Sequence, residues 1–121
     1  MRSGKWLVRE TQIGGRTIRR DEAGFLTDSD DWSNEVAQFI AAEENVELTA
    51  EHMAIIAFMR GYLDDHGLAP DARFAFAFLA DRHGESKADA RRRFFELFPY
   101  GYVKQACKIA GMRQPRAWST G

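Results

Sequence analysis

One change in the spacing of apolar residues divides this chain into two parts. Before Trp32, two short segments flank the pair Gly14-Gly15, and such a pair supplies the positive φ angles that a tight hairpin turn requires. After Trp32, apolar residues recur at intervals of three and four, which is the period of an amphipathic helix. The sequence therefore predicts a β-hairpin followed by a helical body.

The predicted hairpin needs a partner, because two strands alone are only marginally stable in water. A second turn, at the segment DEAG, leads from the hairpin to the apolar pair Phe25 and Leu26. We therefore expect the hairpin to lie against the helices through four side chains, Ile13, Ile18, Phe25 and Leu26.

Capping and helix-ending residues divide the remainder of the chain into five predicted helices. Ser33, Thr49 and Ser86 are placed to cap the first, second and fourth of them, and Asp89 would complete a capping box with Ser86. The residues that end the helices are Gly67, Gly84, Pro99 and Gly111. The predicted helices cover residues 33–44, 50–66, 70–83, 87–98 and 102–110.

The third predicted helix starts at Pro70, since the fixed φ of proline suits a first helical turn. Its expected core residues are Phe74, Ala77 and Phe78. The short segment RHGES joins it to the fourth helix, which gives the pair the turn length of a helix-turn-helix motif. The expected fold class is mainly α: a five-helix, bundle-like domain with an N-terminal β-hairpin, a helix-turn-helix-like pair and a mobile C-terminal arm.

The 121 residues, 45% of them hydrophobic and 29% charged, are expected to form one domain. Its parts are a hairpin region at 1–28, a helical body at 33–111 and the arm at 112–121. No apolar run approaches the ~20 residues that span a bilayer, and the N-terminus lacks the apolar segment of a secretory signal. The single cysteine, Cys107, cannot close an internal disulfide, which suits a reducing compartment. We therefore expect a cytoplasmic protein.

Charge is distributed unevenly along the chain. Residues 1–66 hold 7 Lys or Arg against 13 Asp or Glu, whereas residues 67–121 hold 10 against 5. A basic half suits docking on an acidic protein surface or on phosphates. The fourth helix, which carries Arg91, Arg92 and Arg93, is the candidate for phosphate contact. Consecutive arginines point around much of a helix, so solvated side chains are the default interpretation.

The spacing of the polar residues predicts no metal site, no cofactor site and no catalytic set. His52, His66 and His83 are scattered, and a single cysteine excludes the zinc patterns that need several. We find no glycine loop for phosphate and no combination of nucleophile, base and acid. These observations favour a carrier or regulatory protein over an autonomous enzyme.

Cys107 admits two interpretations. It follows Val103 by four positions and precedes Ala110 by three, which places the thiol on an apolar face, and unpaired cysteine is among the most buried residue types. Lys104 and Lys108 lie close by, and ammonium groups favour the reactive thiolate. The spacing leaves both a core residue and a reactive thiol open.

The segment LFPYGYVKQACKIAGM, which includes Cys107, resembles the DsrC/TusE family of small sulfur-carrier proteins. The segments DEAGFL, DWS, LTAEH and APDAR match the family in the same order, so the resemblance runs from about Ile13 to Pro115. It implies a helical domain with an N-terminal hairpin, a helix-turn-helix-like pair and a mobile C-terminal arm. It also implies a function either together with dissimilatory sulfite reductase or in the sulfur relay that thiolates transfer RNA.

The resemblance further implies where sulfur chemistry would occur. Members that resemble the sulfite-reductase partner carry one cysteine on the last helix and one near the end of the arm, whereas relay members keep the arm cysteine. Cys107 matches the helix cysteine through its KQAC context, but the arm here reads RQPRAWSTG. We expect a paralogue without the arm thiol, in which a relay between two thiols of one chain cannot operate.

Three functions remain in consideration. The first is a DsrC/TusE-like accessory protein of sulfur metabolism that binds a sulfur-relay or sulfite-reductase-type partner, with Cys107, if accessible, as a sulfur-accepting or redox-sensing thiol. The second is a nucleic-acid-binding regulator that uses the basic helix 87–98, and the third is a structural subunit in which Cys107 is inert. The residues expected to contact a protein partner are Lys104, Lys108, Arg113, Arg116 and Trp118.

Overall fold

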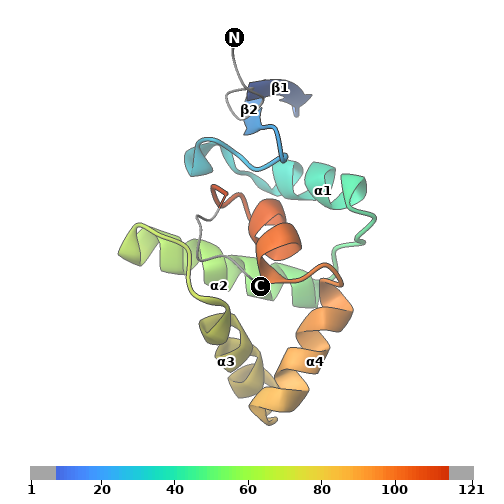
Figure 1. The fold of residues 1–121 in the computed structure, drawn as a ribbon, viewed down its shortest axis with the longest axis vertical. Coiled ribbons are helices and arrows are strands. Elements are labelled where there is room, and N and C mark those ends of the chain that lie inside the picture. Colours follow the sequence, from blue (N-terminus) through green and yellow to red (C-terminus); the bar gives the residue numbers. More distant parts are fainter. Residues whose placement is uncertain (1–7, 115–121) are drawn as a thin grey trace.

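The computed structural model describes residues 8–114, which form a mainly helical fold with an N-terminal hairpin (Figure 1). This confirms the predicted fold class, while residues 115–121 of the expected arm lie outside the described residues and the mobility of the arm stays a prediction. The elements in chain order are β1 (Val8–Ile13), β2 (Arg16–Asp21), the 3₁₀-helix η2 (Ser29–Asp31), α1 (Asn34–Glu43), α2 (Ala50–His66), α3 (Ala72–His83), α4 (Lys87–Leu97) and the terminal helix η3 (Tyr102–Cys107).

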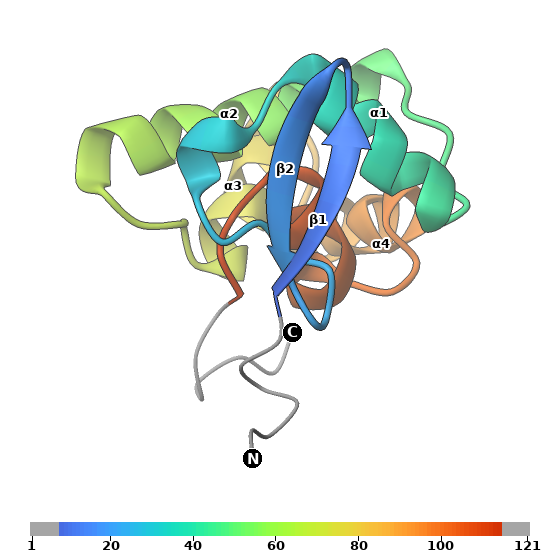
Figure 2. The same ribbon diagram turned by 90° about the horizontal axis from the view of Figure 1, so that it is seen from above.

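The predicted hairpin is confirmed. Strand β1 pairs antiparallel with β2 across a turn at Gly14 and Gly15, whose φ angles are 58° and 78°. Figure 2 shows the hairpin lying along α1. The four residues expected to pack against the helices, Ile13, Ile18, Phe25 and Leu26, are all buried.

A buried arginine fastens the hairpin to the end of α1. Arg20 of β2 is 2% exposed, and its two terminal nitrogens lie 2.6 and 3.2 Å from the two carboxylate oxygens of Glu43. Its Nε also donates to the carbonyl of Gly24 at 2.9 Å. The hydrogen bond from Arg20 is the main cause of the lowered pKa of Glu43. The buried charge is therefore paired, and the pair fixes the hairpin against the helix.

The capping residues read from the sequence are confirmed, but the capping box expected between Ser86 and Asp89 is not formed, because the Asp89 carboxylate pairs with Arg92. The side chains of Ser33, Thr49 and Ser86 accept hydrogen bonds from backbone N–H groups in the first turns of α1, α2 and α4. A reciprocal capping box is present at α2, where Nδ1 of His52 accepts from the backbone N–H of Thr49 at 3.0 Å. Gly67 ends α2 in a left-handed conformation, as its position predicts.

The predicted start of the third helix at Pro70 is wrong. Helix α3 begins at Ala72, because Asp71 is the capping residue: its side chain accepts from the backbone N–H of Arg73 at 2.9 Å. Pro70 precedes the helix, and its carbonyl accepts a hydrogen bond from the hydroxyl of Tyr102 in the terminal helix.

The predicted core face of this helix is wrong in part, since of its three residues only Phe78 packs against the core. Phe74 is 45% exposed and stacks on Tyr62 of α2, with ring centres 5.7 Å apart, while Ala77 and Phe78 are only half-buried. Several sides of α3 carry apolar residues, so their spacing alone does not distinguish the side that faces the core. The buried residues of α3 are Ala75, Leu79 and Ala80.

The terminal helix runs through the middle of the fold, between α1 and α2 in Figure 1. It differs from the predicted α-helix because its first turns are π-helical: the N–H of Ala106 donates to the carbonyl of Gly101, five residues earlier, at 3.2 Å. Within residues 8–114, no helix combines the length and apolar character needed to cross a membrane. Six residues of this terminal segment are at most 1% exposed, namely Tyr102, Gln105, Ala106, Cys107, Ile109 and Ala110.

Gly111 ends the terminal helix with a φ of 77°, and a Cβ there would lie within 2.7 Å of three side-chain atoms of Trp32. We expect Gly111→Ala to lower the free energy of unfolding by about 1–2 kcal/mol through its left-handed backbone. Overlap with the indole should remove about 1–3 kcal/mol more. Urea unfolding followed by circular dichroism measures both losses together.

The matched control is Gly67→Ala. Gly67 has a φ of 76°, but nothing lies within 4 Å of the added carbon, so this variant should lose only the backbone part. Equal losses in the two variants would contradict the close approach between Gly111 and Trp32.

Candidate functional site

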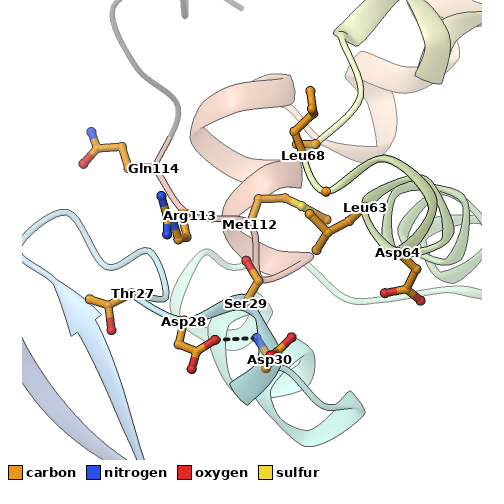
Figure 3. Close-up of a pocket in the computed structure, with 12 residues that line it drawn as sticks. Thr27, Asp28, Ser29, Asp30, Leu63, Asp64, Leu68, Met112, Arg113 and Gln114 are labelled. Carbon is orange, nitrogen blue, oxygen red and sulfur yellow. Dashed lines mark hydrogen bonds between the residues drawn. The ribbon is translucent and has the colours of Figure 1, made fainter.

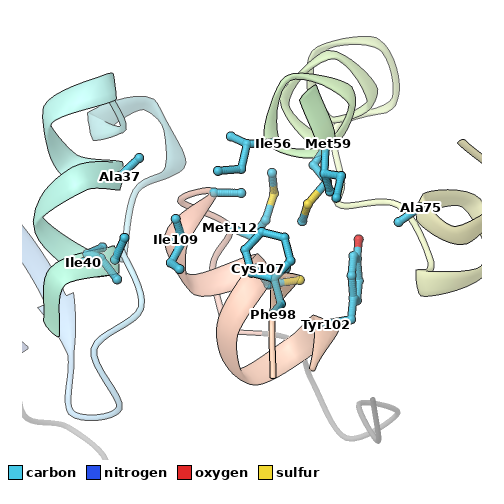
Figure 4. Close-up of a cluster of buried hydrophobic side chains, with 14 of the residues drawn as sticks. Ala37, Ile40, Ile56, Met59, Ala75, Phe98, Tyr102, Cys107, Ile109 and Met112 are labelled. Atoms are coloured by element: carbon cyan, nitrogen blue, oxygen red, sulfur yellow. The ribbon is translucent and has the colours of Figure 1, made fainter. Parts of the chain in front are cut away.

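Cys107, the candidate sulfur-accepting residue, is sealed in the core. It is 0% exposed, and Figure 4 shows it beside Phe98 and Tyr102. Ala110 is buried and Val103 half-buried on the same helix, which confirms the predicted apolar face. A reagent in solution therefore reaches this sulfur only if the terminal helix moves away from its neighbours.

The environment of Cys107 also keeps its thiol protonated. Burial raises the pKa of the thiol to about 12, and a hydrogen bond with Tyr102 offsets this only in part. At neutral pH the group is therefore not the thiolate, which is the nucleophilic form. The interpretation in which Lys104 and Lys108 promote the thiolate is not supported. Carrying sulfur on Cys107 requires an accessible sulfur atom. In this structure the sulfur is not accessible.

Lys108, one of the residues predicted to contact a partner, is engaged within the fold. Its Nζ lies 3.2 Å from a carboxylate oxygen of Glu44 and 5.3 Å over the ring of Phe25. The other carboxylate oxygen of Glu44 accepts from Gln105 at 3.4 Å, and Gln105 in turn accepts from the backbone N–H of Tyr100 at 3.2 Å. This network ties the terminal helix to the end of α1.

The other residues expected to contact a protein partner fall into two groups. Lys104 and Arg113 are exposed, so both stay candidates. Arg116 and Trp118 lie outside the described residues. All five contacts therefore stay predictions, and among the described residues Lys104 and Arg113 are accessible positive charges.

The three consecutive arginines of α4 are partly neutralised. Arg92 lies 2.8 Å from Asp89, and Arg93 makes two hydrogen bonds to Glu85 at 2.9 and 3.1 Å. Arg91 is exposed and stacks over aromatic rings. A continuous basic face for a nucleic-acid backbone is therefore not formed by these three side chains.

Arg60, which the sequence analysis misses, holds the C-terminal end of the last helix. Its guanidinium donates to the carbonyls of Ala110 and Ser29, both at 3.0 Å, and lies 4.7 Å over the ring of Trp32. Nε1 of Trp32 donates to the carbonyl of Ile109 at 2.9 Å. Burial lowers the pKa of Arg60. The only sequence signal for this role is a charge on the otherwise apolar face of α2.

A pocket of about 820 Å³ opens beside the residues that follow the terminal helix (Figure 3). Leu63, Leu68 and Met112 supply its apolar part, and Figure 3 shows the side chains of Leu63 and Met112 directed toward one another. The described chain ends at Gln114, which also lines the pocket. The charged side chains of the lining are the carboxylates of Asp28, Asp30 and Asp64 and the guanidinium of Arg113.

The three histidines occupy separate places. His52 is buried, with Nε2 2.8 Å from the carbonyl of Leu97. His83 pairs with Glu51, and His66 is exposed at the end of α2. Among residues 8–114, no group of three or more His, Cys, Asp or Glu side chains is placed to hold a metal ion.

Comparison with known proteins relates the chain to proteins of sulfur transfer. Residues 12–117 match the family described as DsrC like protein. The sulfurtransferase TusE of Pectobacterium atrosepticum is 38% identical over 104 residues, which are 86% of this chain and 94% of the relative. That of Yersinia pestis is 37% identical over 104 residues, with the same shares of both chains. The chain belongs to the DsrC/TusE family, as its motifs predict.

Solved structures agree with this assignment. The oxidized γ-subunit of the dissimilatory sulfite reductase (DsrC) from Archaeoglobus fulgidus aligns with a TM-score of 0.78 and 35% identity, covering 90% of this chain and 98% of that chain. DsrC of Allochromatium vinosum aligns with a TM-score of 0.79 and 34% identity, covering 92% and 98%. These relatives are named for sulfur transfer and sulfite reduction, so they lend no support to the alternative of a nucleic-acid-binding regulator.

The raised pKa of Cys107 predicts a pH dependence of stability. The folded thiol keeps its proton up to about pH 12, whereas its ordinary pKa is 9.0, so the folded state binds more protons between these values. Stability should therefore fall as pH rises through this window. Between pH 8 and pH 10, urea unfolding should show a loss about 1–2 kcal/mol larger in the wild type than in Cys107→Ala.

The comparison between the two proteins is internally controlled, because their sequences differ only at residue 107. Cys107→Ala also lowers stability at every pH by removing buried volume, but this loss does not depend on pH. Parallel pH profiles for the two proteins would show that the thiol is not shielded as described.

Proposed function

We propose that this protein is a cytoplasmic accessory protein of sulfur metabolism, which binds a sulfur-relay or sulfite-reductase-type protein without carrying sulfur on Cys107 in its folded state. The observation that carries this proposal is a sealed, protonated thiol inside a DsrC-type fold. Sulfur transfer to a thiol requires a thiolate that reaches the sulfur of the donor. The thiol of Cys107 is protonated, and its sulfur is not accessible in the folded state.

The class of partner is supported by the relatives. TusE is named a sulfurtransferase, and DsrC is named the γ-subunit of dissimilatory sulfite reductase. The chain spans 94% of the first and 98% of the second. A fold conserved over nearly the whole length of these proteins supports a docking role with the same class of partner.

Reaction at Cys107 would require the terminal helix to leave the core. That movement breaks the hydrogen bond between Tyr102 and Pro70 and the ion pair between Lys108 and Glu44, and it exposes side chains of the central core. Opening of a central element costs a large share of the free energy of unfolding. We therefore expect a binding or regulatory role, with Cys107 as a packing residue, rather than autonomous sulfurtransferase catalysis.

The exposed cations Lys104 and Arg113 are the proposed contacts for an acidic surface of the partner. Arg116 and Trp118, which follow in the sequence, are proposed to extend this contact. Residues 67–121 hold 10 basic and 5 acidic side chains, and this net positive charge supports the proposed contact, because opposite charges on two proteins favour their association.

Intact-mass spectrometry tests the state of the thiol. After incubation with an inorganic polysulfide at neutral pH, the folded protein should keep its mass, whereas the same protein in concentrated urea should gain sulfur. Cys107→Ser, which has no thiol, should gain none in either condition. Full modification of the folded wild type would show that Cys107 carries sulfur and would overturn this part of the proposal.

Binding to a purified dissimilatory sulfite reductase or TusE-binding relay protein tests the partner class. Cys107→Ala should bind as the wild type does, and Arg113→Glu should bind about two- to five-fold more weakly, as expected for loss of an exposed ion pair. Arg73→Glu is the control, because Arg73 is also an exposed cation, with 81% of its side chain accessible. Lack of wild-type binding to both kinds of partner at low salt would contradict the proposal.

A further inference from the structure

Aromatic rings of α2 and α3 meet in a cluster that reaches the surface. Phe58 stacks on Phe78 with ring centres 4.8 Å apart, and Tyr62 stacks on Phe74 at 5.7 Å. The first two rings are half-buried against the core, whereas Phe74 is 45% exposed. His66 extends the cluster, with its ring centre 4.1 Å from that of Tyr62. We call these five rings the aromatic face, and an exposed apolar patch of this kind is typical of a surface that another molecule covers.

The surface of α2 beside these rings carries small residues. Ala57 and Gly61 are exposed one turn apart, and Gly61 lies three positions after Phe58 on the same side of the helix. Nothing lies within 4 Å of the place that a Cβ would take at Gly61. Figures 1 and 2 both show the C-terminal end of α2 projecting from the body of the fold. Glycine within a helix lowers its stability relative to alanine, so helix formation does not explain Gly61, whereas close approach of another backbone does.

An aspartate lies at each end of the aromatic face. Asp65 follows Tyr62 by three positions and Asp81 follows Phe78 by three, so each carboxylate is on the same side of its helix as the rings. Both aspartates are exposed, and none of the salt bridges within residues 8–114 includes either of them. Both occupy the last turn of a helix, where negative charge lowers stability. Folding therefore does not account for these two charges, which are available to the cations of a partner.

The charges also argue against a second copy of this chain as the occupant. A second copy would bring its own Asp65 and Asp81 to the contact, and like charges across an interface are unfavourable. Arg73, the exposed cation next to Phe74 in the sequence, is already paired with Asp71 at 3.2 Å. An occupant with its own cations fits the face better.

We propose that the aromatic face binds a basic, apolar segment of another protein. Its apolar side chains lie on Phe74 and the neighbouring rings, and its lysines or arginines pair with Asp65 and Asp81. This inference goes beyond the proposed function and does not depend on it, because the contact proposed there joins Lys104 and Arg113 to an acidic surface. The two surfaces select partners of opposite charge.

Fluorescence anisotropy with a labelled helical peptide and the full chain tests the aromatic face. The probe carries leucines on one side and lysines on the other, and a control peptide has glutamate in place of every lysine. The lysine peptide should bind and the glutamate peptide should not. Phe74→Ser should weaken binding about ten-fold, as expected for loss of a central aromatic contact. Asp65→Asn and Asp81→Asn should each weaken it about two- to five-fold, as expected for loss of an exposed ion pair.

Gly61→Gln separates binding from folding. Glutamine favours a helix more than glycine does, so this variant should resist urea at least as well as the wild type. Its side chain should nevertheless block the approach of the peptide and weaken binding as much as Phe74→Ser does. Leu68→Ser and Glu22→Gln are the matched controls, because both change exposed residues outside the aromatic face. Both should bind the lysine peptide as the wild type does.

Several results would overturn the proposal. Weaker binding in Leu68→Ser with none in Phe74→Ser would assign the peptide to the pocket that Leu68 lines. Dimerisation of the wild type in sedimentation, lost in Gly61→Gln, would assign the face to a second copy. Absence of binding by the lysine peptide, or equal binding of both peptides, would show that the face does not recognise a basic segment.

Discussion

Burial of the terminal helix is the constraint on which the rest of this structure depends. Three separate parts of the chain hold that helix: α2 through Arg60, the end of α1 through the ion pair to Lys108, and the loop before α3 through the hydrogen bond to Tyr102. A shift of the helix would break these contacts together, so they make its position well determined. The chemistry of Cys107 follows from that position, since burial outweighs every local charge that could activate the thiol.

The sequence predicts best what depends on neighbours in the sequence. The cap at Thr49 and the helix end at Gly67 are correct because a side chain or a φ angle decides each of them locally. Phe74 is placed wrongly because its helix carries apolar residues on several sides, and the choice between them depends on which elements pack there. The role of Arg60 could not be predicted, because its partners lie 31 and 50 residues away.

The same distinction applies to the site. Helical spacing places Cys107 correctly on an apolar face, but it contains no information on how completely other elements cover that face. The lysines beside it in the sequence argue for activation, yet Lys108 turns to Glu44 on another element. The uneven charge of the chain is resolved in a similar way: Glu51 and Glu44 of the acidic half pair with His83 and Lys108 of the basic half. Ion pairs within the fold therefore neutralise part of the charge difference between the two halves of the sequence.

The π-helical turns of η3 have a consequence for how this segment tolerates change. A π-helical turn contains about one residue more than an α-helical turn of 3.6 residues. Deleting a single residue between Tyr102 and Cys107 would let the backbone relax to an ordinary α-helix, and the residues downstream would keep nearly the same angular positions, because the residue lost is the extra one of the π-helical turn. Ile109 would then keep its carbonyl contact with Trp32, and Gly111 would stay close to the indole. The π-helical turns are thus the place in this segment where the chain tolerates a change of length.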